Sequence, residues 1–163
     1  MKKITILCVL CTIALAGYSQ NIFTNKNEKY RISGEVIGLQ DSTVMLAYYF
    51  GGKQYATDTA DVINGKFTFK GNKELKGGMY LVVLSNNQYF DLIISEQYFS
   101  FSTELNNLVG AMTFTKSVEN PPFYEYLNFI VQMQQEVNPI RQQLENAENE
   151  SKIKLQNKIK EID

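Results

Sequence analysis

The sequence contains no histidine and no tryptophan, and cysteine accounts for only two of its 163 residues. The absence of histidine excludes catalytic Ser-His and Cys-His pairs, general base catalysis by imidazole and metal sites that use imidazole ligands. The net charge is −1 and the basic residues form no cluster, so nothing predicts a surface that binds nucleic acid. Asp58 and Asp61 would point to opposite faces of a strand and could not share a cleft. We therefore expect a chain that is not an enzyme and holds no metal or cofactor.

Both cysteines lie in an N-terminal segment that has the pattern of a secretory signal peptide. Two lysines precede an apolar run at residues 4–16, and the small residues Gly17 and Ser19 follow it. This pattern predicts a signal peptide over residues 1–19, with cleavage after Ser19 or after Ala16. The protein would then be exported to the periplasm or the cell envelope. A lipoprotein anchor is disfavoured because a leucine precedes each cysteine, so contact with a membrane is expected only through export or such an anchor.

The spacing of Cys8 and Cys11 is that of a redox-active dithiol. A thioredoxin-type CxxC pair follows a strand and opens a helix, where the helix N-terminus lowers the thiol pKa. Cys8 and Cys11 instead lie inside the apolar core of the predicted signal peptide, so we assign them to export. Removal of residues 1–19 would leave a mature chain without cysteine, which could neither form nor exchange a disulfide.

The mature chain has the composition and the alternation typical of β-strands. Hydrophobic residues make up 44% of the sequence and aromatic residues 12%, all of them tyrosine or phenylalanine. Apolar and polar residues alternate in short segments that are separated by turn residues. These features predict a mainly β domain over residues 22–118, either an antiparallel β-sandwich or an open barrel. We expect about eight short strands, at residues 30–37, 44–50, 54–63, 66–71, 79–84, 89–95, 98–103 and 111–117.

Asn64 and Gly65 separate two strand-forming segments and predict a type I′ turn, because both tolerate a positive φ. A two-residue turn fixes the register of the strands that flank it, and these would form a half-buried hairpin with Phe67 and Phe69 on its buried face. The predicted cross-strand pairs are Ile63 with Lys66, Val62 with Phe67, Asp61 with Thr68 and Ala60 with Phe69.

The pattern changes from strands to helices at Glu119, so residues 119–163 are predicted to form a helical hairpin or linker. Asn120 is a suitable N-cap, with proline at the first helical position. Asn138 and Pro139 repeat this signal and predict that a second, more polar helix begins there. Because no helix stop signal occurs before Asp163, we expect the natural protein to continue beyond this sequence.

The candidate partner-binding residues are four side chains close to Gly51-Gly52: Tyr48, Tyr49, Tyr55 and Asp58. With Phe50, the three tyrosines form an aromatic cluster, and exposed aromatic rings can stack on sugars or bind a protein partner. Strand alternation sends about half of such side chains inward, which favours packing in the core and at sheet edges for most of them. Asp58 also has a structural interpretation, as a carboxylate that caps the rim of the sheet.

Several motifs occur in an order that resembles a known family of exported proteins. They are Tyr30-Arg31-Ile32-Ser33-Gly34, Asp58-Thr59-Ala60, residues 64–71, Gly78-Met79-Tyr80-Leu81-Val82, Tyr89-Phe90 and Ser117-Val118-Glu119-Asn120. Residues 30–120 resemble the DUF4369-like N-terminal domain of unknown function that precedes a TlpA/ResA-like thioredoxin domain in exported bacterial thiol–disulfide oxidoreductases. The helical region from Pro121 is similar to the linker that follows in such proteins.

The resemblance implies that redox chemistry belongs to a C-terminal thioredoxin-like domain with a CxxC motif, which this sequence does not include. The chain would then be a non-catalytic β domain that recognises a client or positions the redox domain. Its expected partners are that thioredoxin-like domain and a client protein of the cell envelope. The alternative is a free-standing envelope module that binds glycans or proteins through its aromatic residues.

Overall fold

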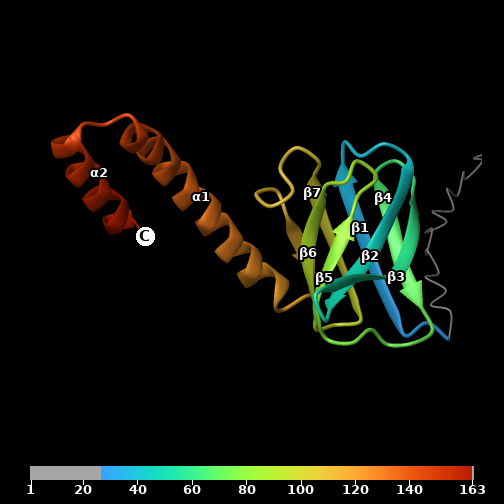
Figure 1. Ribbon diagram of the computed structural model, residues 1–163. Helices are drawn as coiled ribbons and strands as arrows, with labels where there is room; N and C mark the ends of the chain where they lie inside the picture. The colour runs from blue at the N-terminus through green and yellow to red at the C-terminus, as the bar shows by residue number, and fades with distance from the viewer. Residues whose placement is uncertain (1–26, 163) are drawn as a thin grey trace, which may run out of the picture.

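The computed structural model describes residues 27–162, so the predicted signal peptide and both cysteines lie outside the described residues. The described part contains eight strands followed by two helices (Figure 1), which confirms the mainly β prediction. None of the helices in this part is long and apolar enough to cross a membrane. The strands are β1 (Tyr30–Ile37), β2 (Ser42–Phe50), β3 (Lys53–Val62), β4 (Lys66–Gly71), β5 (Gly78–Val83), β6 (Tyr89–Ile94), β7 (Tyr98–Glu104) and β8 (Thr113–Thr115), and the helices are α1 (Asn120–Glu145) and α2 (Asn149–Ile162).

The strands form two four-stranded sheets with the orders β4-β1-β7-β8 and β3-β2-β5-β6. The sheets pack face to face around one core (Figure 1), so of the two predicted architectures the sandwich is the one present. All strand pairs are antiparallel except β1 and β7, which are parallel and place Ile32 opposite Phe99. This arrangement leaves β3, β4, β6 and β8 at the edges of the sheets.

The turn at Asn64 and Gly65 is present, with φ values of 53° and 76°. Ile63 and Lys66 exchange two main-chain hydrogen bonds of 2.9 and 3.0 Å across it, as predicted. Beyond that pair, the predicted hairpin ladder is wrong, because β3 pairs with β2 and β4 pairs with β1. The pairs that do not form are Val62 with Phe67, Asp61 with Thr68 and Ala60 with Phe69.

The physical reason is that this turn joins the two layers of the sandwich. On either side of the turn, β3 and β4 diverge into different sheets, and each directs its apolar side chains into the space between the layers. Val62, Phe67 and Phe69 are buried, as the hairpin prediction required, although they reach the core from opposite layers.

Phe101 lies at the centre of an aromatic cluster in the core. Its ring centroid is 5.9 Å from that of Phe67, 5.5 Å from that of Phe90 and 6.3 Å from that of Phe114. Gly34 on the neighbouring strand makes room for this cluster, because a Cβ at that position would lie 2.6 Å from the rings of Phe67 and Phe101. The cluster connects both sheets, since Phe90 is on β6 and the other rings are on β4, β7 and β8.

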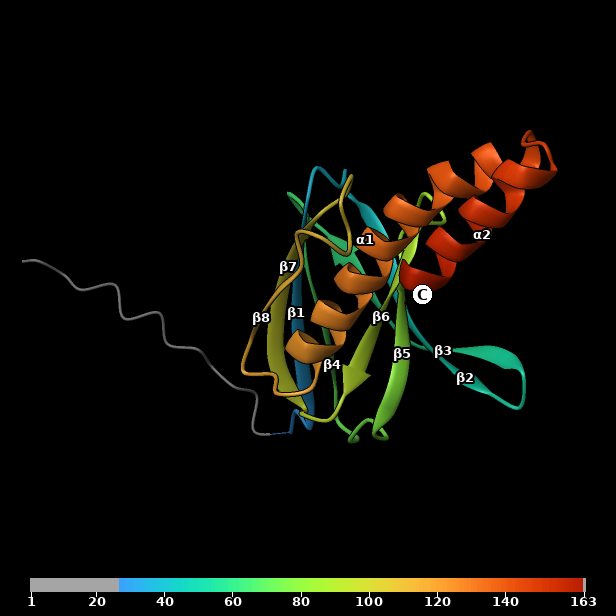
Figure 2. The same cartoon turned by 90° about the vertical axis from the view of Figure 1, so that its left-hand side faces the viewer.

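The helices form the predicted hairpin, but the break between them is not at Pro139. Helix α1 continues through Pro139 to Glu145, and the chain then reverses so that α2 packs back along α1 (Figures 1 and 2). Proline removes one helical hydrogen bond and usually favours a break. Here Pro139 is exposed while Val137 and Ile140 on either side are buried, and their packing holds the helical turn together.

Candidate partner-binding site

The β2–β3 hairpin extends beyond the rest of the sandwich (Figure 2) and carries all four predicted site residues, three of them in its outer part. We call its outer part, residues 48–56, the aromatic hairpin. Gly51 and Gly52 form its turn with φ values of 58° and 74°, the positive values that a type I′ turn needs. The strand register pairs Tyr48 with Tyr55 across this hairpin. The glycine pair thus sets which aromatic residues face each other.

Three aromatic side chains of the aromatic hairpin are exposed to solvent. The exposed fraction is 71% for Phe50, 52% for Tyr49 and 42% for Tyr55, whereas Tyr48 is half-buried. Packing in the core and at sheet edges therefore does not account for most of this cluster, because the hairpin projects away from the opposite sheet (Figure 2). Large apolar groups that remain in solvent are typical of interaction sites.

A row of tyrosines connects this exposed hairpin to the core. The rings of Tyr55 and Tyr48 are stacked with centroids 5.6 Å apart, and Tyr80 on β5 follows at 5.8 Å from Tyr48. The exposed fraction of the side chain falls along the row to 5% at Tyr80. Burial, and to a smaller extent the nearby Tyr48, raises the pKa of Tyr80. On the opposite face, Gln54 Nε2 donates a 2.7 Å hydrogen bond to Tyr49 Oη. These contacts hold the rings in place.

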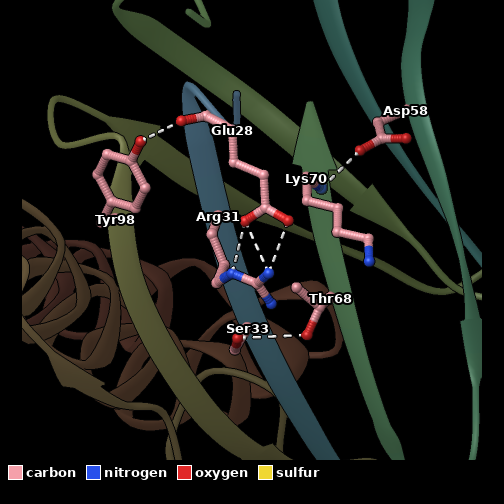
Figure 3. Close-up of polar contacts among 7 residues, drawn as sticks. All are labelled: Glu28, Arg31, Ser33, Asp58, Thr68, Lys70 and Tyr98. Atoms are coloured by element: carbon pink, nitrogen blue, oxygen red, sulfur yellow. Dashed lines mark hydrogen bonds and ion pairs between the residues drawn. The ribbon is translucent and has the colours of Figure 1, made fainter. Parts of the chain in front are cut away.

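Asp58 lies at the base of the aromatic hairpin and bonds across the two sheets. Its Oδ2 atom accepts hydrogen bonds from Tyr30 Oη at 2.7 Å and from the main-chain N–H of Lys70 at 3.0 Å. Its Oδ1 atom accepts a 2.8 Å bond from the N–H of Thr59. Figure 3 shows the side chain of Asp58 directed from β3 toward β4. This geometry matches the interpretation of Asp58 as a carboxylate that caps the rim of the sheet. Any bond from Asp58 to another molecule would compete with the three hydrogen bonds that it accepts within the chain.

Burial and the hydrogen bond to Asp58 raise the pKa of Tyr30 far above its ordinary value. We expect Tyr30→Phe to lower the free energy of unfolding by about 1–2 kcal/mol at neutral pH, because Asp58 loses a donor. Above about pH 10 the tyrosines of the unfolded chain ionise while Tyr30 of the folded protein stays protonated, so the wild type loses stability as the pH rises. The difference in the free energy of unfolding between the wild type and Tyr30→Phe should therefore become smaller above about pH 10. Urea unfolding followed by circular dichroism measures it, with the exposed Tyr89→Phe as control; a difference independent of pH would contradict this assignment.

A shallow depression of about 490 Å³ lies on the outer face of the β4-β1-β7-β8 sheet, where sequence reasoning predicted no site. Small hydroxyl side chains line it, and Ser33 and Thr68 bond to each other at 3.3 Å (Figure 3). Figure 3 also shows the ion pair of Arg31 on β1 with Glu28, which precedes that strand. Within residues 27–162 no group of three or more acidic, cysteine or histidine side chains could hold a metal ion.

The start of α1 is fastened to the free side of β6. Asn120 is fully buried; its Nδ2 donates to the carbonyl of Ile93 at 2.7 Å and its Oδ1 accepts from the N–H of Ile93 at 2.8 Å. The predicted N-cap role of Asn120 is wrong, because Glu119 occupies the cap position without a side-chain bond. One turn later, Tyr124 Oη donates a 2.8 Å hydrogen bond to the carbonyl of Asp91. Burial of Tyr124, and to a smaller extent the charge of Asp91, raises the pKa of the Tyr124 hydroxyl.

Comparison with known proteins gives one match. The family model described as Domain of unknown function (DUF4369) matches residues 30–123, which run from the first residue of β1 into the first turn of α1. No curated protein and no solved structure matches the chain. The matched range covers more than half of the sequence and includes the aromatic hairpin, Asp58 and Asn120. The chain therefore belongs to the DUF4369 family of domains of unknown function.

Proposed function

We propose that this chain is the non-catalytic β domain of an extracytoplasmic thiol–disulfide oxidoreductase of the thioredoxin family, and that it recognises a protein client through the aromatic hairpin. The observation that carries the recognition role is the exposure of Tyr49, Phe50 and Tyr55 on a hairpin that projects from the sandwich. The link to thioredoxin-family proteins and to export rests on the sequence motifs and the signal pattern. The sequence has no histidine and no cysteine after Cys11, which supports a non-catalytic role.

The aromatic hairpin has the features of a binding hot spot. Phenylalanine and tyrosine bury a large area at a small cost in side-chain entropy, and a few such residues usually dominate the binding energy of an interface. Tyr49 lies on one face of the hairpin, while Phe50 and Tyr55 lie on the other, because residues alternate along a strand. A partner groove could therefore enclose the hairpin from both sides.

The helices also suit the other role that the family resemblance implies, the positioning of a redox domain. Two residues of the first helical turn, Asn120 and Tyr124, hold α1 against β6, so the direction in which the helix leaves the sandwich is fixed. A thioredoxin-like domain connected through α1 and α2 would then stay at a defined distance from the aromatic hairpin. A client bound to the aromatic hairpin would then stay close enough to encounter that domain many times before it dissociates.

Binding of an unfolded client tests the recognition role. The probe is reduced insulin B chain with its thiols blocked by iodoacetamide, added to the chain that lacks residues 1–19. We expect Tyr49→Ala with Phe50→Ala to weaken binding by about tenfold or more in fluorescence anisotropy, because two exposed rings are removed. The control is Val118→Ala, which truncates a side chain that is also highly exposed but lies away from the hairpin.

Equal binding by the wild type and the double variant would contradict recognition by the aromatic hairpin. The non-catalytic part has its own test, because the chain without residues 1–19 is expected to leave the rate of insulin reduction by dithiothreitol at background. Clear turnover above that background would contradict it.

A second candidate function is a free-standing envelope module that binds glycans. The stacked pair of Tyr48 and Tyr55 favours it, because tyrosine faces can stack on sugar rings. A glycan array separates the two candidates. Binding that is lost in Tyr48→Ala or Tyr49→Ala would favour the glycan module, and an array without signal counts against it.

A further inference from the structure

The edges of the two sheets differ in how their outward main-chain groups are satisfied. On β6, the side chains of Asn120 and Tyr124 bond the outward groups of Ile93 and Asp91. On β4, Lys66 pairs with Ile63 across the turn, and Asp58 accepts from the N–H of Lys70. The edge strand β8 is only three residues long. Such devices prevent a sheet edge from pairing with another chain.

In the described structure, the outer half of β3, within the aromatic hairpin, has no comparable bonds to its outward main-chain groups. In a two-residue hairpin the pair next to the turn, Phe50 and Lys53, exchanges both hydrogen bonds, and the pairs then alternate. Gln54 and Ala56 therefore direct their N–H and C=O groups away from β2, toward solvent. Among the described residues β3 pairs with β2 alone, and no turn, loop or side-chain hydrogen bond involves the main-chain groups of Gln54 or Ala56. Both residues are exposed.

We propose that this edge of β3, residues 53–56, binds an extended segment of an unfolded client as an added β-strand. Outward donors and acceptors that alternate at strand spacing match another extended main chain, which is the basis of β-strand addition. The inference deepens the proposed function and rests on it, since it names how the aromatic hairpin holds its client. Binding through the main chain would accept many sequences, which suits a domain that serves several clients.

The side chains around this edge define the chemistry of the bound segment. Phe50 and Tyr55 lie on one face of the hairpin, so every second residue of the segment would be apolar or aromatic. Lys53 is the one charged residue between positions 48 and 57, which favours an acidic residue near the turn end of the segment. The same lysine disfavours self-pairing of two copies, because lysine on an edge strand opposes edge-to-edge association.

Hydrogen exchange of individual amides by NMR tests this mode directly, with the blocked insulin B chain as the probe and the chain that lacks residues 1–19. The amides of Gln54 and Ala56 should exchange rapidly in the free protein and at least about tenfold more slowly with the probe, since strand addition satisfies them. The amide of Tyr55 bonds to β2 already and should change little.

A main-chain substitution provides the matched variant. Ala56→Pro removes one outward N–H and leaves the ladder to β2 intact, and proline is tolerated at such a position of an edge strand. It should weaken probe binding by about five- to tenfold. Ala56→Ser keeps the N–H group and should bind like the wild type. Circular dichroism of each variant checks that the fold is retained.

The outcomes separate this inference from the proposed function. If removing Tyr49 and Phe50 side chains weakens binding but Ala56→Pro does not, and the two amides stay unprotected, strand addition is overturned while side-chain recognition stands. If neither change affects binding, both are overturned. A third outcome is that the amides of Gln54 and Ala56 become protected as the protein concentration rises without the probe, while light scattering shows a dimer. This would mean that the edge binds a second copy of the chain, and it would also overturn binding of a client segment.

Discussion

Replacing Phe101 with alanine is expected to lower the free energy of unfolding by about 3–5 kcal/mol, the usual range for truncation of a buried phenylalanine. Phe101 is 4% exposed and its ring contacts aromatic rings from both sheets, so the void that remains cannot be filled by movement of one strand. Urea unfolding followed by far-ultraviolet circular dichroism measures the change, since the protein has no tryptophan. Phe50→Ala is the matched control; its side chain is 71% exposed, and the same substitution should cost less than about 0.5 kcal/mol.

A double-mutant cycle with Gly34 tests the packing more closely. Gly34→Ala alone should destabilise the protein, because the added Cβ would lie 2.6 Å from the rings of Phe67 and Phe101. In the Phe101→Ala background one of these clashes is gone, so the two changes should be non-additive by about 1 kcal/mol or more. Additive effects, or a Phe101→Ala variant as stable as the Phe50→Ala control, would contradict the central position of Phe101.

The second large effect is expected for Asn120→Ala, which should lower the free energy of unfolding by about 2–4 kcal/mol. The substitution removes both partners of the Ile93 main chain and leaves these groups without a hydrogen bond beneath α1. Because α1 would keep only the Tyr124 bond to β6, the amide of Ile93 should exchange with solvent much faster than in the wild type. Chemical unfolding and hydrogen exchange together measure both consequences.

Asn138→Ala is the control for this substitution, because Asn138 is an exposed asparagine on the same helix. It should change the stability by less than about 0.5 kcal/mol. An Asn120→Ala variant with a protected Ile93 amide and unchanged stability would show that the side-chain amide is not what holds α1 in place.

The sequence predicted the strands well because each is defined by local alternation and by turn residues. Each of the eight predicted segments overlaps one strand, and β1 occupies residues 30–37, the range predicted for it. The partners of the strands could not be predicted in the same way. The turn at Asn64 and Gly65 was identified correctly, yet its chemistry is the same whether the chain continues a hairpin or crosses between two sheets. The parallel pairing of β1 with β7 has no local signal at all.

The helical region illustrates the same limit. Asn120 and Pro139 both carry strong local signals for a helix start. In the structure the side-chain amide of Asn120 bonds to the main chain of Ile93, a residue 27 positions earlier. Pro139 lies inside α1, where the packing of the buried residues Val137 and Ile140 keeps the chain helical. Long-range contacts overrode the local preference in both places.

The candidate site was predictable in its residues more than in its geometry. Tyr48, Tyr49 and Tyr55 were selected because they cluster around Gly51-Gly52, and the hairpin does hold them together. Their exposure was not predictable, because it depends on how far β2 and β3 extend past the opposite sheet (Figure 2). The position of β3 at the edge of its sheet follows from the order of the strands, which alternation does not specify.

The parallel pair of β1 and β7 has a consequence for how the chain acquires its structure. Residues 31–37 lie beside residues 98–104, so the first strand has its partner on that side only after most of the chain is present. Closure of such a long loop is entropically unfavourable and slows folding. A nascent chain would thus carry an incomplete first sheet until Glu104 has emerged.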